Sequence, residues 1–153
     1  MLRRERGVTL IELAVVMAIV AIMALFLAPA IGEWLDNFRI RQAGRDIVSH
    51  LQLAKIRAIS SGLQYRVRFD LANNEYLVEK NNGVWQQEGS VFRVPRSVDI
   101  ASATGSLGSP PKVKFNPNGT CSSGHITIDN EKGKQYNIYV HFTGRIRIEE
   151  FHP

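Results

Sequence analysis

The chain has 153 residues, 44% hydrophobic and 22% charged, with 19 Lys and Arg against 14 Asp and Glu. This balance excludes a disordered or low-complexity protein, because it is typical of packed domains and the net charge is only +5. The single cysteine, Cys121, excludes an intrachain disulfide framework, so stability must come from burial, assembly or a membrane anchor.

The N-terminal segment is the most unusual part of the sequence. Residues Leu13 to Gly32 contain no charged side chain, and a helix of this length spans about 30 Å, the thickness of a bilayer's hydrocarbon core. Arg3, Arg4 and Arg6 precede the block. Because positive charges favour the cytoplasmic side, we predict a single-pass membrane helix with a cytoplasmic N-terminus. An ordinary cleaved signal peptide, with Ala28-Pro29-Ala30 as its processing site, is the alternative.

Glu12 stands directly before the apolar block. A charge at the centre of a spanning helix costs about 2.5 to 3.5 kcal/mol, and less near the edge, so such a residue usually has a partner. The alternative is that its side chain reaches the membrane interface alone. The short basic leader ending in Gly7, followed by Val8-Thr9-Leu10-Ile11-Glu12 and an apolar helix, resembles the N-terminus of the type IV pilin superfamily.

The resemblance implies a processing and assembly pathway. A prepilin peptidase would cut between Gly7 and Val8, and the new amino group of Val8 would be methylated. Removing the leader leaves 16 of the 19 basic and 13 of the 14 acidic side chains. Glu12 would then pair with the N-terminal amine of a neighbouring subunit and set the register of assembly. Pro29 either kinks the helix or marks its exit from the membrane.

Beyond the apolar block, the pattern indicates an amphipathic continuation of the same helix. Ile47, Leu51, Ala54 and Ala58 recur at steps of three and four residues. Ser60-Ser61-Gly62 predicts its C-terminal end.

From residue 63 the apolar period changes to two, which predicts strands. Tyr65, Val67 and Phe69 alternate with arginines before a turn at Asn73-Asn74. Further strands are expected over residues 75–80, 84–87, 91–94, 113–115, 125–128, 136–142 and 146–148. The stretch Ser97 to Pro111, rich in Ser, Gly, Ala and Pro, indicates a loop.

The predicted fold is therefore α+β, with a long N-terminal transmembrane-plus-amphipathic helix packed on a C-terminal antiparallel β-sheet domain. Its parts are a leader peptide (1–7), a transmembrane and assembly helix (8–32), an amphipathic continuation (33–62) and a β-rich globular domain (63–153).

This layout narrows the resemblance to the H-type pseudopilins of type II secretion and related minor pilins, the GspH/FimT group. Three further segments carry it: Gln52 to Ala58, Phe115 to Gly119 and Gly144 to Arg147. The resemblance implies a non-enzymatic subunit of a type II secretion or type IV pilus machine, located in the bacterial inner membrane with its C-terminal domain in the periplasm, and then at the tip of a pilus or pseudopilus. The implied partners are other major and minor subunits, prepilin peptidase, and secreted cargo or DNA.

The C-terminal domain offers no pattern typical of an enzyme. Cys121, His125 and His141 lack the spacing of a tight metal site, and Cys121 is expected to be a loop thiol. We therefore expect no catalytic residue, no metal site and no cofactor. An exported enzyme remains an alternative hypothesis.

DNA binding for uptake is a further alternative, because some minor pilins of this group bind DNA. The Gly144-Arg145-Ile146-Arg147 segment would put both guanidinium groups on one strand face, where they could contact phosphates. The patch would be extended by Lys112, Lys114, Lys132 and Lys134. An ordinary solvated strand face is the competing interpretation, and Glu149-Glu150 would repel phosphate.

Overall fold

The computed structural model describes residues 8–151, apart from the side chains of residues 25–31 and 33. The chain divides into two compact units, Met1–Leu35 and Asp36–Pro153. A single helix, α1 (Leu10–Ser61), begins in the first unit and ends in the second. The second unit also contains the nine strands found among the described residues.

The helix α1 ends where the sequence predicts. Gly62 follows it with a φ of 68°, the left-handed conformation that favours glycine after a helix. The helix is continuous through Pro29, and the kink predicted there stays a prediction. Among the described residues, no helical window combines the length and mean hydropathy of a membrane span.

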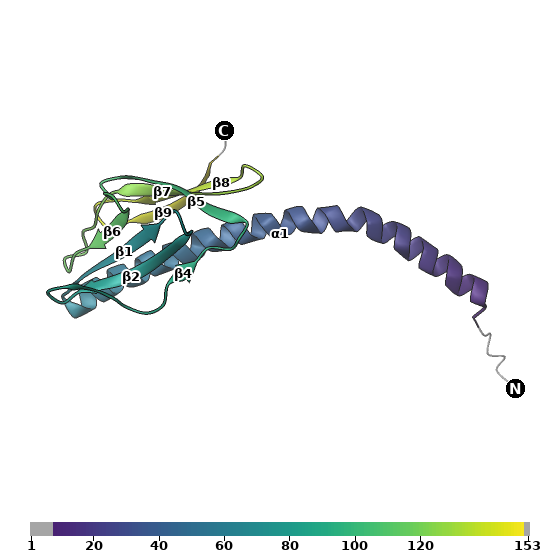
Figure 1. Ribbon diagram of the computed structural model, residues 1–153, viewed down its shortest axis with the longest axis horizontal. Helices are drawn as coiled ribbons and strands as arrows, with labels where there is room; N and C mark the ends of the chain where they lie inside the picture. The colour runs from purple at the N-terminus through teal and green to yellow at the C-terminus, as the bar shows by residue number, and fades with distance from the viewer. Residues whose placement is uncertain (1–7, 152–153) are drawn as a thin grey trace, which may run out of the picture. The chain divides into compact units, whose positions relative to one another are not determined.

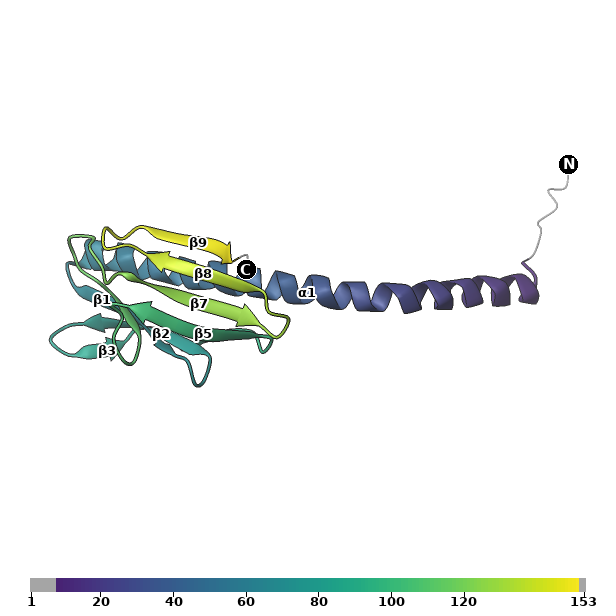
Figure 2. The ribbon, with the colours of Figure 1, turned by 90° about the horizontal axis from the view of Figure 1, so that it is seen from above.

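The strands form two antiparallel sheets. Sheet A has the order β3-β2-β1-β6, with β4 also paired to β2. Its members are β1 (Gln64–Asp70), β2 (Glu75–Asn81), β3 (Trp85–Gln87), β4 (Phe92–Arg93) and β6 (Lys112–Phe115). Sheet B has the order β5-β7-β8-β9, and Figure 2 shows its strands side by side. Its members are β5 (Val98–Gly105), β7 (Gly124–Asn130), β8 (Gln135–Val140) and β9 (Ile146–Phe151).

Within the second unit, the C-terminal part of α1 packs on both sheets, as the ribbon in Figure 1 also shows. The predicted apolar stripe is confirmed, because Ile47, Leu51, Ala54 and Ala58 are all fully buried. They share a core with Val67 and Phe69 of sheet A and with Ile126, Ile128 and Ile138 of sheet B. Gly44 has a packing role: a Cβ there would lie 2.5 Å from Cδ1 of Ile148.

One expectation about this region is wrong. Residues 97–111 were expected to form a loop, but β5 covers eight of them and pairs with β7. Val98 and Ile100 are buried in alternation, and a bulge after Ile100 shifts the register. Ser102, Ala103 and Thr104 continue the strand with small side chains, so local composition hides a strand stabilised by its neighbour.

The expected strand over residues 136–142 is shorter than predicted. The strand β8 ends at Val140, and the Phe142 side chain is 61% exposed in the following turn. Asn130 holds the turn that precedes β8. Asn130 Oδ1 accepts hydrogen bonds from the backbone nitrogens of Lys132 and Lys134, at 3.2 and 2.8 Å.

Candidate functional sites

The N-terminal end of α1 is organised by Thr9. The backbone nitrogen of Glu12 donates a 3.2 Å hydrogen bond to Thr9 Oγ1, so Thr9 is the N-cap of the helix. A carboxylate in the first turn also interacts favourably with the helix dipole. This role of Thr9 was not predicted, although Thr-x-x-Glu before an apolar run is the signature of a capping box. Of the two residues at the predicted cleavage site, Val8 is described by the structure and Gly7 lies outside the described residues.

The apolar side chains that follow are uncovered in the isolated chain. Each of the described large apolar residues from Val8 to Met23 exposes at least half of its surface. They are Val8, Leu10, Ile11, Leu13, Val15, Val16, Met17, Ile19, Val20, Ile22 and Met23. An apolar surface of this length is typical of a segment that is covered by a membrane or by other proteins.

The Gly-Arg-Ile-Arg segment spans the end of the turn before β9 and the first two residues of that strand. Arg145 and Arg147 are exposed while Ile146 and Ile148 are partly buried against the core, as the alternation predicts. Arg147 forms a solvated ion pair with Glu149, at 3.8 Å. The two guanidinium groups are therefore available to a ligand.

Gly144 of the same segment is needed for packing. Its φ is 75°, and a Cβ there would lie 2.6 Å from the Gly119 carbonyl oxygen and 2.7 Å from Lys55 Cε. Its own carbonyl oxygen accepts a 2.9 Å hydrogen bond from Lys55 Nζ, which ties the turn to α1. The glycine of the segment thus has a structural role that is separate from the exposed arginines.

The four lysines predicted to extend the arginine patch are divided between other sites. Lys132 forms a 3.0 Å ion pair with Asp36, and Lys134 forms one of 2.7 Å with Glu150. The hydrogen bond from Lys134 to Glu150 raises the pKa of Lys134. Lys112 and Lys114 belong to β6 in the other sheet.

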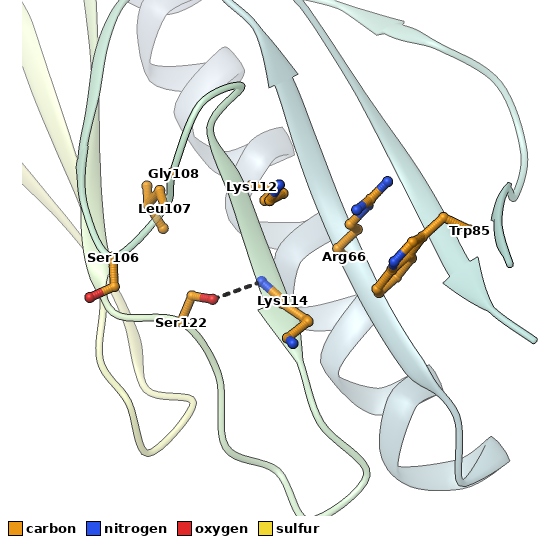
Figure 3. Close-up of a pocket in the computed structure, with 8 residues that line it drawn as sticks. All are labelled: Arg66, Trp85, Ser106, Leu107, Gly108, Lys112, Lys114 and Ser122. Carbon is orange, nitrogen blue, oxygen red and sulfur yellow. Dashed lines mark hydrogen bonds between the residues drawn. The ribbon is translucent and has the colours of Figure 1, made fainter. Parts of the chain in front are cut away.

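Lys112 and Lys114 border a pocket of about 400 Å³, shown in Figure 3. Arg66 and Trp85 line one side of it, with the guanidinium carbon 4.1 Å from the centre of the indole ring. The opposite side is formed by Ser106, Leu107, Gly108 and Ser122. This pocket was not predicted, because it depends on the pairing of strands that are far apart in the sequence.

Cys121 lies in the segment between β6 and β7, as expected, and its side chain is buried. Its Sγ donates a hydrogen bond to the His141 carbonyl oxygen at 3.0 Å, and burial raises the pKa of the thiol. The imidazole of His125 instead lies beside the Thr104 hydroxyl, at 3.0 Å. Over the described part of the chain, no three His, Cys, Asp or Glu residues form a group that could hold a metal.

Comparison with known proteins gives two family matches. Residues 43–144 match the model of the family "Type II transport protein GspH", and residues 2–28 match the "Prokaryotic N-terminal methylation motif". A type II secretion system protein H from Xanthomonas campestris is 24% identical over 151 residues, which cover 95% of this chain and 83% of that protein.

Solved structures share the fold. The minor pseudopilin EpsH of the Vibrio cholerae type 2 secretion system superposes with a TM-score of 0.62 at 16% identity, over 73% of this chain and 97% of that one. The type IV minor pilin FimU of Pseudomonas aeruginosa gives a TM-score of 0.56 at 16% identity, over 71% and 87% of the two chains.

Proposed function

This chain belongs to the GspH family of type II transport proteins, as its sequence motifs predicted, and we propose that it is a non-enzymatic minor subunit at the tip of a pseudopilus or pilus. It enters the bacterial inner membrane as a single-pass protein, with its N-terminus in the cytoplasm and its β-rich unit in the periplasm. Prepilin peptidase cuts it between Gly7 and Val8, the amine of Val8 is methylated, and the apolar helix joins other major and minor subunits.

The observation that carries this proposal is the arrangement at the start of α1. The helix begins just after the Gly7-Val8 bond, is capped by Thr9 and carries Glu12 in its first turn. Beyond it, the described large apolar side chains up to Met23 are exposed. Cleavage creates a free amine four residues before Glu12. A carboxylate at the entrance of an apolar segment gains most from a cationic partner, which the amine of a neighbouring subunit supplies.

Cleavage is tested by intact mass and N-terminal sequencing of the protein from its native membrane, with and without active prepilin peptidase. The expected product starts at Val8, with or without one added methyl group. A product that starts near Ile31 would instead identify an ordinary exported protein and would overturn the proposal.

The role of Glu12 is tested with Glu12→Gln, which keeps the shape of the side chain and removes its charge. We expect normal cleavage but a strongly reduced yield of the subunit in sheared filaments or in cross-linked complexes with the other subunits. Glu131→Gln, in the exposed turn before β8, is the matched control and should assemble normally. Equal assembly of both variants would refute the register role.

DNA binding through the Gly-Arg-Ile-Arg segment is a second candidate, favoured by the shared exposed face of Arg145 and Arg147. It predicts binding that falls steeply with salt and is lost in the Arg145→Gln, Arg147→Gln double variant. A salt-insensitive interaction, or one that the double variant retains, would exclude this site.

A further inference from the structure

Sheet A carries four cationic side chains on adjacent strands. In the antiparallel register of β1 and β6, Arg66 lies directly opposite Lys114, and Arg68 lies opposite Lys112. All four point away from the core, because the alternate residues of both strands are buried. Like charges at directly opposed positions destabilise a sheet. The arrangement is therefore not explained by the stability of the sheet itself.

The acidic residues near this array neutralise only its β1 side. Glu79 on β2 contacts Arg66 at 2.5 Å and Arg68 at 3.8 Å. The pKa of Asp70 is lowered mainly by its hydrogen bond from Asn73 and further by the charge of Arg68. Neither Lys112 nor Lys114 forms an ion pair with any of the residues that the structure describes. The unbalanced positive charge is thus concentrated on β6.

These two lysines face a concave site rather than a flat surface. Both line the pocket of about 400 Å³, together with the hydroxyl-bearing residues Ser106 and Ser122 (Figure 3). Arg66 is fixed at its rim between the Glu79 carboxylate and the Trp85 ring. A cation held in position before binding loses little conformational freedom when an anion arrives. The pocket therefore has the charge, the volume and the partial rigidity of a site for an anionic group.

We propose that this pocket docks an extended acidic segment of a partner protein, with carboxylates bound by Lys112 and Lys114. The inference rests on the proposed function, because it describes the chemistry of a subunit or cargo protein that the β-rich unit would contact. Residues two apart on a strand are separated by about 6.6 to 6.8 Å, so an extended peptide with acids at alternate positions has the same repeat as the two lysines.

The surroundings of the pocket favour a short acidic peptide over nucleic acid. Glu79 and Asp70 lie on the same face of sheet A as the four cations. A long polyanion would cross these carboxylates as it left the pocket, whereas a peptide with two or three acids ends within the cationic area. A phosphate backbone gains affinity mainly by contacting many cations in succession, which this bounded array does not offer.

The test measures binding of a fluorescein-labelled hexapeptide of alternating Asp and Thr to the full chain in neutral detergent micelles, by fluorescence anisotropy. The test variant is Lys112→Gln, Lys114→Gln. The matched control is Arg145→Gln, Arg147→Gln, which removes the same charge from two exposed positions outside sheet A. Two other ligands are measured in parallel: the hexapeptide with Asn in place of Asp, and an oligothymidine. Circular dichroism confirms that each variant is folded.

We expect the acidic peptide to bind the unchanged chain. Its affinity should fall at least about tenfold in the lysine variant and change less than about twofold in the arginine variant. An equal loss of peptide affinity in both variants would show that only the net charge of the chain matters, and would overturn the proposal. Absence of peptide binding, or tighter oligothymidine binding that depends on the same two lysines, would also overturn it. Because the assay needs neither cleavage nor assembly, its failure would leave the proposed function to be judged by the Glu12→Gln experiment.

Discussion

Replacing Gly144 by Ala separates the structural part of the Gly-Arg-Ile-Arg segment from the part that could bind a ligand. An L-residue in the left-handed conformation costs about 1 to 2 kcal/mol. The added Cβ would also lie 2.6 Å from the Gly119 carbonyl oxygen, which is backbone and cannot simply rotate away. Forcing an extra carbon into such a contact costs about 1 to 3 kcal/mol. We therefore expect Gly144→Ala to lower the free energy of unfolding by about 2 to 5 kcal/mol.

The matched control is Gly133→Ala. Gly133 has nearly the same φ, 78°, but no atom lies within 4 Å of the position that its Cβ would occupy. The Gly133→Ala variant should lower the free energy of unfolding only by the conformational cost, about 1 to 2 kcal/mol. Urea unfolding of the full chain in neutral detergent, followed by circular dichroism, measures both variants. Equal destabilisation of the two would refute the close approach of Gly144 to Gly119, and no loss in either would refute the left-handed backbone at both turns.

Three further predictions use the same unfolding assay or a thiol reagent. Lys114→Gln should raise the free energy of unfolding by about 0.2 to 1 kcal/mol, because it relieves the repulsion from Arg66, and a loss of stability would contradict that repulsion. Leu51→Ala should lower it by about 2 to 5 kcal/mol through a cavity in the core, whereas Leu53→Ala, 38% exposed on the same helix, should cost far less. At pH 8 the buried Cys121 thiol, whose pKa is raised by burial, should react with Ellman's reagent only as the chain unfolds, and a rapid reaction of the folded chain would contradict its burial.

The features that the sequence predicted correctly depend on local periodicity. The buried stripe of α1 follows from apolar residues at steps of three and four, and the β1–β2 hairpin follows from alternation around Asn73-Asn74. The N-cap at Thr9 could also have been recognised, since its pattern with Glu12 is local. In each case the residues that make the structure are neighbours along the chain.

The features that could not be predicted depend on pairing between distant segments. The strand β5 has large apolar residues only at its start, and its second half is held by β7, some twenty residues further along the chain. In the same way, Lys112 and Lys114 looked like an extension of the arginine patch until the β1–β6 register brought them opposite Arg66 and Arg68. Long-range register decides which charges are neighbours, and no local pattern records it.

This division of the basic residues changes how the candidate functions are distinguished. Arg147 belongs to β9 in sheet B and Arg145 directly precedes that strand, whereas Lys112 and Lys114 belong to β6 in sheet A. A polyanion that needed all four cations would have to reach both sheets, so nucleic-acid binding and acidic-peptide docking require different residues. If both sites exist, the Arg145→Gln, Arg147→Gln variant should lose DNA binding and keep peptide binding. The Lys112→Gln, Lys114→Gln variant should do the reverse. Loss of DNA binding in the arginine variant alone, with peptide binding intact, would mean that the two sheets carry separate functions.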